Sequence, residues 1–214
     1  MQEKKSGKLM SREWSSALSG DRQGQRDQLP GKLEKILAAA VEIIGSEGPH
    51  AVTHRKVAAH AGVSLGLTTY YFKDRGDLLF RAEEYAYVVE EERLRSLVEE
   101  ATLNGNIEAI AELLTAMFFD KAVADPLYDI ALFEMFLEAT RNERVRAVTT
   151  RWSHLIFELI DRVLPEKIRF QPREMAIQIL AATIDGLMLE ETSNKELGIE
   201  GLKSHLEAVL RLII

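Results

Sequence analysis

The sequence predicts an all-α protein. Apolar residues recur at three- and four-residue spacing over most of the chain, and no stretch sustains the two-residue alternation of a half-buried strand. Apolar residues make up 46% of the 214 residues, which is ample for a buried core. We expect three parts: a flexible polar arm over residues 1–30, a helix-turn-helix domain over 31–77, and a larger helical domain over 78–214.

The arm is rich in Gln, Ser, Gly, Lys and Arg and shows no helical period. We expect it to end at Leu29-Pro30-Gly31. Its Trp14 either docks elsewhere or, as is usual for a lone aromatic residue in a tail, has no partner. The first predicted helix follows, and Gly45 to Pro49 stop it. Its apolar stripe consists of Leu33, Ile36, Leu37, Ala40 and Ile44.

Two short helices joined by a tight turn are predicted over residues 53–72. Thr53 stands where a hydroxyl can cap the first of them, and Ser64 stands at the same place before the second. Gly62 is the turn residue, because it takes positive φ without a steric cost. We expect Phe72 to point inward. The first short helix has a small apolar stripe of Val57, Ala58 and Ala61.

A long helix and several shorter ones complete the pattern. Asp74 and Asp77 resemble a capping pair for a helix that runs to about Ala101, where Asn104-Gly105 break the pattern. Four or five more helices follow, a layout consistent with a six-helix C-terminal domain. Their apolar stripes begin at Ile107, Ile130, Val145, Ile177 and Leu202, and the second of them includes Phe133 and Leu137.

Charge is divided unevenly along the chain. Residues 1–77 carry 12 Lys and Arg against 9 Asp and Glu, whereas residues 78–214 carry 15 against 25. DNA phosphates require local positive charge, so the acidic part is a poor candidate for a DNA surface. The only part with a positive balance also carries the two short helices.

The segment Ala61-Gly62-Val63-Ser64, with Gly66, Phe72, Arg75 and Leu78-Leu79, resembles the TetR family of transcriptional regulators. The resemblance covers about residues 33–80. It implies an Ω-shaped homodimer with three N-terminal helices for double-stranded DNA and a helical C-terminal domain for a small molecule. Thr68 departs from the pattern, because the family usually has a buried Leu there.

The candidate DNA-binding residues follow from side-chain chemistry and from the resemblance. Arginine is the best bidentate reader of guanine, and at least one of two adjacent tyrosines must be free for phosphate or base contact. The alternative is a solvated surface charge for Arg55, Lys73 and Arg75, and a place in the core for Tyr70 and Tyr71. The set is His54, Arg55, Lys56, Leu65, Gly66, Thr69, Tyr70, Tyr71, Lys73 and Arg75.

Two further sets of residues are predicted in the C-terminal domain. A small-molecule pocket could be lined by Met117, Phe118, Phe133, Phe136, Trp152, His154 and Asp185, although residues at this spacing could equally form the core. Small residues let helices approach closely, which favours a four-helix dimer interface on the last two helices. Its candidate residues are Ala182, Thr183, Gly186, Leu206, Val209 and Leu210.

Several functions are disfavoured. With no cysteine, the chain has no disulfide or thiolate chemistry. Gly62 to Gly66 satisfies G-x-S-x-G, but the hydrolase elbow needs a preceding strand. His50, His54 and His60 do not share one helix face, so we expect no metal site. We expect no cofactor and no membrane span, and hence a soluble, cytoplasmic protein.

The leading hypothesis is a ligand-responsive repressor that binds a palindromic operator as a homodimer and is released by a small molecule. An activator of the same fold would use the same contacts. A rival from another class is an all-α small-molecule or partner-binding protein whose helix-turn-helix is structural. An enzyme is the weakest alternative, since no nucleophile, metal cluster or phosphate loop is in place.

Overall fold

The computed structural model describes residues 29–214 apart from 104 and 120–126. The predicted arm, with Trp14, lies almost wholly outside the described residues. Every regular element in the described part is helical, as the sequence predicts. None of these helices is both long and apolar enough to cross a membrane.

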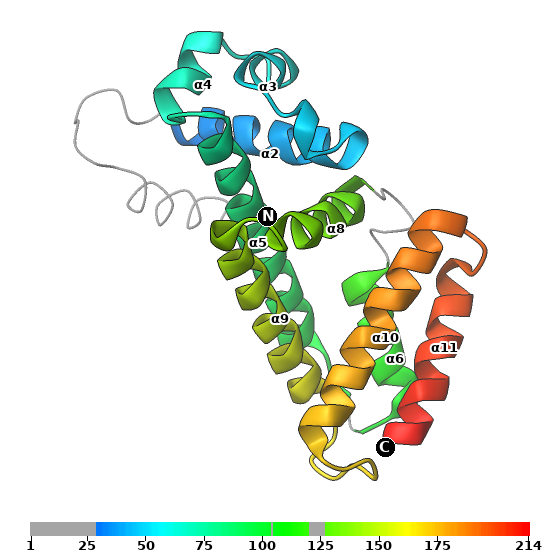
Figure 1. Cartoon of the computed structure of the whole chain (residues 1–214). Helices are drawn as coiled ribbons and strands as arrows, with labels where there is room; N and C mark the ends of the chain where they lie inside the picture. Colours follow the sequence, from blue (N-terminus) through cyan, green and yellow to red (C-terminus); the bar gives the residue numbers. More distant parts are fainter. Residues whose placement is uncertain (1–28, 104, 120–126) are drawn as a thin grey trace.

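The N-terminal helices form a head with its own apolar core (Figure 1). Ile36, Val57, Phe72 and Leu78 meet in this core and are at most 1% exposed. The elements of the head are α2 (Leu29–Glu47), the 3-10 turn η1 (Pro49–Ala51), α3 (His54–His60) and α4 (Leu65–Tyr71).

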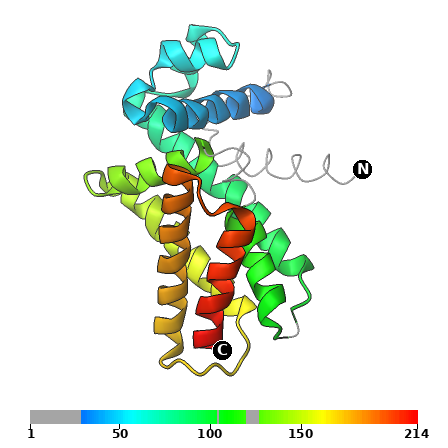
Figure 2. The same ribbon diagram turned by 90° about the vertical axis from the view of Figure 1, so that its right-hand side faces the viewer.

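A long helix, α5 (Arg75–Glu100), begins in the head and runs into a larger helical body (Figures 1 and 2). The body has a second apolar core, which includes Leu94, Leu114, Leu159 and Leu206. Its other elements are α6 (Ile107–Phe118), α8 (Leu127–Ala139), α9 (Glu143–Val163), α10 (Arg173–Asn194) and α11 (Gly198–Ile213).

The local signals in the head act as the sequence predicts, with one exception. The Thr53 hydroxyl accepts from the Lys56 N–H at 3.2 Å, and the Asp74 carboxylate accepts from the Asp77 N–H at 2.9 Å. Gly62 has φ 64°, so the turn uses the freedom that only glycine supplies cheaply. Ser64 precedes α4, but its hydroxyl makes no capping hydrogen bond.

Two sequence-based expectations are corrected. The first helix begins at Leu29 rather than after Gly31, since proline is compatible with a first helical turn that needs no N–H donor. On α8 the expected stripe through Leu137 is wrong, because Leu137 is 58% exposed. The buried apolar side of α8 carries Ala131, Met135 and Ala139 instead.

The crossing of α2 and α8 joins the head to the body and is the most extensive contact between any two of the described helices. Gly45 makes this approach possible. A Cβ at Gly45 would lie 2.0 Å from the carbonyl oxygen of Leu127, far inside van der Waals contact. Tyr128 anchors the same end of α8 to α5, because its hydroxyl donates to the Ala86 carbonyl at 2.6 Å.

The crossing also explains why α2 is buried on more than one side. The α2 helix contacts α3 and α5 as well as α8, and Ala40 of its predicted stripe is fully buried. Val41 and Ile44 are also buried, and together with Ala131 and Met135 of α8 they line an apolar cavity. The α2 helix is therefore held between the helix-turn-helix and the body.

We expect Gly45→Ala to destabilise the protein by about 1–3 kcal/mol, the usual cost of forcing an extra methyl group into a packed contact. The matched control is Gly31→Ala in the same helix, because a Cβ there would meet nothing within 4 Å. Urea unfolding of both variants measures the difference. Equal stability of Gly45→Ala and the wild type would contradict the described crossing.

Candidate nucleic-acid interface and ligand cavity

The inner side of α4 fixes how the helix sits on the head. Thr68 is fully buried, and its hydroxyl donates to the Leu65 carbonyl at 2.8 Å. The buried hydroxyl is therefore satisfied within its own helix, which accounts for a Thr at a position where a buried Leu is usual. Phe72, 1% exposed, closes the same side of the helix end.

The outer side of the two short helices is open to solvent. Tyr70 is 71% exposed and its ring stands edge-on against that of Tyr71, with centroids 5.5 Å apart. Arg55 is exposed and has no ion-pair or hydrogen-bond partner among the described residues. Seven of the predicted residues are exposed here, and Arg75 is one of them, although its guanidinium is hydrogen-bonded within the head. We call the other six the outer face: Arg55, Leu65, Gly66, Thr69, Tyr70 and Lys73.

The other four predicted DNA contacts are less free. Lys56 is paired with Glu47, and His54 is half-buried with its Nδ1 enclosed. Tyr71 is half-buried against the head core, and burial raises the pKa of its hydroxyl. These residues border the outer face.

Arg75 connects the start of α5 to the segment before α3. Its Nε donates to the Val52 carbonyl at 2.9 Å and its Nη2 to the Pro49 carbonyl at 2.6 Å. Charged donors on two backbone carbonyls hold η1 in place and so position α3. This structural role is an addition to the sequence-based expectation, which considered phosphate contact or a solvated surface charge.

Two small cavities, one within the body and one between the body and the head, share Tyr128, Leu132 and Trp152 in their walls. Each measures about 20 Å³, which is room for one water molecule. We call the one between α5, α6, α8, α9 and α10 the body cavity. Four of the predicted ligand residues line it: Met117, Phe118, Trp152 and Asp185.

The body cavity also has polar walls that the sequence analysis did not single out. Arg93 donates to the Glu90 carboxylate and to the Met117 carbonyl, so the pair ties α5 to α6. Asp129 of α8 completes this side. Burial of the carboxyl raises the pKa of Asp185, although the residue as a whole is exposed.

Three predicted ligand residues lie outside both cavities. His154 is exposed, because it falls on the solvent side of α9 while Trp152 and Leu155 face inward. Phe136 is 36% exposed and Phe133 half-buried, since the register of α8 turns Leu132 and Met135 toward the cavities instead.

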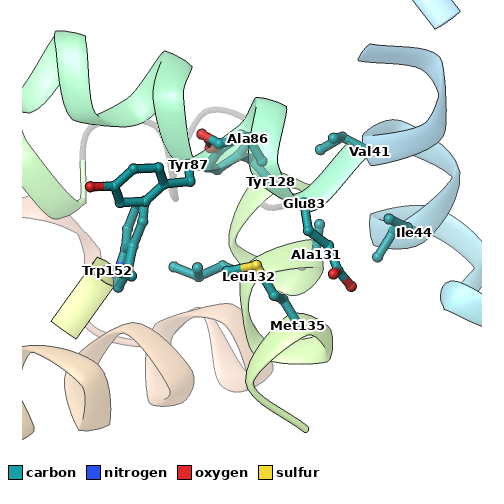
Figure 3. Close-up of a pocket in the computed structure, with 10 residues that line it drawn as sticks. All are labelled: Val41, Ile44, Glu83, Ala86, Tyr87, Tyr128, Ala131, Leu132, Met135 and Trp152. Carbon is teal, nitrogen blue, oxygen red and sulfur yellow. Dashed lines mark hydrogen bonds between the residues drawn. The ribbon is translucent and has the colours of Figure 1, made fainter. Parts of the chain in front are cut away.

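The other cavity lies between the head and the body, and we call it the junction chamber (Figure 3). Val41 and Ile44 enter it from α2. Glu83 of α5 is 4% exposed, and its Oε2 has no hydrogen-bond partner in the described structure. Burial first, and the nearby Glu138 second, raise the pKa of Glu83 to about 8.

A sequence signal for Glu83 did exist. It lies on the buried side of α5 with Leu79, Ala82 and Tyr87, at helical spacing. A carboxylate in the middle of an apolar stripe is unusual, since burying a charge without a partner is costly. The pattern could have identified the residue but not the chamber around it.

The predicted dimer residues divide into three groups by their exposure. Leu206 and Leu210 are fully buried in the core of the single chain, where α11 packs on α6, so their assignment to an interface is wrong. Thr183 and Val209 are half-buried. Ala182 and Gly186 are exposed and belong to an open apolar stripe along α10 with Met175, Ile179 and Leu189.

The fold and its outer face define a class: a helical DNA-binding regulator with a helix-turn-helix head. Residues 36–82 match the family model described as bacterial regulatory proteins, tetR family. Residues 105–214 match the tetracyclin repressor-like C-terminal domain. The chain belongs to the TetR family of transcriptional regulators.

Individual proteins are similar to this chain over most of its length. The regulator BetI of Serratia proteamaculans is 26% identical over 164 residues, covering 75% of this chain and 80% of BetI. A regulator structure from Streptomyces coelicolor has 26% identity and a TM-score of 0.64, covering 86% of this chain and 98% of that one. The multidrug binding protein EbrR complexed with proflavin has 25% identity and a TM-score of 0.58, covering 85% and 99%.

The buried carboxyl predicts a pH dependence of folding. In the unfolded chain Glu83 ionises near pH 4.5, whereas in the folded chain it does so near pH 8. The folded protein binds the extra proton between these values, so its stability falls as the pH rises through this window. Glu83→Gln should remove this dependence, which amounts to at most about 1.4 kcal/mol per pH unit.

Urea unfolding of wild type and Glu83→Gln at pH 5.5, 6.5 and 7.5 measures the effect. At each increase in pH, the free energy of unfolding of the variant should rise relative to that of the wild type. A difference that stays constant over this range would mean that Glu83 is not held as the neutral acid.

Proposed function

We propose that the chain is a ligand-responsive repressor that binds a palindromic DNA operator as a homodimer and is released by a small molecule. The observation that carries the proposal is the outer face, where an unpaired arginine and an exposed tyrosine stand on a rigid helix pair. Phosphate contacts position such a face, and base contacts give it specificity.

The outer face divides into roles by chemistry. Arg55, near the start of α3, is free to pair with guanine, and Tyr70 offers a hydroxyl to a base or a phosphate. Lys73 stands beyond the end of α4, where a point charge suits phosphate. Gly66 has open space around it, so the backbone of α4 can approach DNA closely.

Dimerisation is proposed through the open stripe of α10. Its members Met175, Ile179, Ala182, Gly186 and Leu189 alternate at four- and three-residue spacing, the repeat of a helix-to-helix seam. Leu212 of α11, 75% exposed, extends the apolar surface. Two such heads would meet half-sites about 34–36 Å apart or a multiple of this distance.

The body cavity and the junction chamber are the proposed effector region. The relative EbrR, complexed with proflavin, supports a small-molecule effector for this chain. An effector changes DNA binding only if it prefers one of two head arrangements. An activator would use the same DNA-binding face and the same cavities. Expression of a reporter gene placed behind the operator distinguishes repression from activation.

We expect Arg55→Ala and Tyr70→Ala to weaken specific operator binding by about 1–3 kcal/mol each while thermal unfolding stays nearly unchanged. Binding of fragments selected from random DNA, followed by titration of the best fragment, measures the loss. The comparison variant Thr150→Ala changes an exposed residue of α9, away from the outer face, and should bind DNA normally. Full operator affinity in both head variants would contradict the assignment of Arg55 and Tyr70 as DNA contacts.

We expect Ala182→Arg to convert the dimer to a monomer, because it places a charge in the middle of the apolar stripe. Light scattering after gel filtration gives the mass. Leu137→Arg puts the same charge on another exposed apolar position, on α8, and should leave the dimer intact. A dimeric Ala182→Arg would place the interface elsewhere.

A further inference from the structure

The junction chamber has an acidic group at one end and aromatic rings at the other. Figure 3 shows the Glu83 carboxyl beside Ile44 and Ala131, while Tyr87 and Trp152 lie at the far side. The two rings meet edge to face, with centroids 6.2 Å apart. Carboxylate and aromatic faces are the two protein groups that attract a desolvated positive charge.

The charges around Glu83 are one-sided. Glu138 of α8 carries a negative charge and raises the pKa of Glu83. The groups that α2 and α9 contribute to the chamber are Val41, Ile44 and Trp152, which carry no charge. No basic side chain is paired with Glu83 in the described structure. Arg151 pairs with Glu84 and stands over the Tyr87 ring, 4.9 Å from its centroid, so it covers part of the aromatic end of the chamber.

An anionic occupant would meet repulsion from Glu138 and from Glu83 once it ionises, and an uncharged apolar one would leave the Glu83 oxygen unsatisfied. A cation supplies the missing counter-charge for the Glu83 carboxylate. We propose that the junction chamber binds the positively charged group of a small organic cation, with Glu83 as its counter-charge and Tyr87 and Trp152 against its apolar body. This inference rests on the proposed function, because it names the chemical class of the effector.

The junction chamber is too small for an organic cation unless its walls move. At about 20 Å³ it admits one water molecule, so an organic cation must displace wall side chains such as Leu132 and Met135. Val41 and Ile44 of α2 are also in the wall, so we expect the displacement to shift α2 relative to α8. Leu132 also walls the body cavity, and its displacement would join the two spaces. The occupant thus binds best to the arrangement in which the head has moved, which is the condition for control of DNA binding.

Ionisation is coupled to occupancy. In the empty chamber Glu83 has a raised pKa of about 8 and holds a proton at neutral pH. A cation stabilises the carboxylate and releases that proton. Affinity should therefore rise with pH up to about 8 and level off above it.

The test uses proflavin, a planar organic cation, titrated into the full chain without DNA by calorimetry at pH 6.5, 7.5 and 8.5. Wild type should bind with affinity that rises by about tenfold per pH unit at most and should release a proton, seen by comparing two buffers of different ionisation heat. Glu83→Gln should bind at least tenfold more weakly, with no proton release. Glu99→Gln, an exposed carboxylate on the same helix, should behave as wild type.

Three results would overturn the proposal: no proflavin binding, unchanged binding to a Glu83→Gln variant that melts like a folded protein, or equal binding of an anionic aromatic sulfonate. Operator binding is measured separately on the same preparations. An intact operator complex with any of these three results removes the cation site and leaves the DNA-binding function standing.

Discussion

The close approach of α2 to α8 is the contact on which the arrangement of this protein depends. It exists because Gly45 presents no side chain to the Leu127 carbonyl. Among the described helices, the other main connection between the head and the body is α5, a single long helix. With α8 packed against it, α2 has a fixed position on both sides, and α3 and α4, which pack on the head core, take their position from α2.

The same contact places chemistry between the two parts. The junction chamber lies where α2, α5 and α8 meet, and Glu83 is enclosed there without a counter-charge. Arg75 acts at the other end of the head, where its guanidinium holds η1 to the start of α5. One end of the head is thus held by the hydrogen bonds of Arg75. The other end packs on the body and encloses the Glu83 carboxyl. Under the proposed function, a molecule that enters this end would change the position of α3 and α4.

Local features were predictable because their causes lie within a few residues. The Thr53 cap, the positive φ of Gly62 and the inward position of Phe72 each follow from side-chain type and spacing. The tertiary contacts were not predictable in this way. Arg75 bonds to carbonyls 23 and 26 residues away, and the second buried side of α2 depends on the position of α8.

The candidate sites show the same division. Exposure of Tyr70 follows from the helical period, since Phe72 is turned inward, but the partial burial of His54 and Tyr71 depends on the packing of α3 and α4 together. Leu206 and Leu210 were placed at an interface because apolar helical faces look alike in sequence. Only the position of α6 shows that they belong to the core of one chain.

The central claim is that head and body are locked together through α2 and α8, and native-state hydrogen exchange tests it most directly. The amides of α2 and α8 should open with the same free energy and the same dependence on denaturant, as one cooperative unit. Exchange of α2 together with α3 and α4 through a lower-energy opening, while α8 stays protected, would contradict the account.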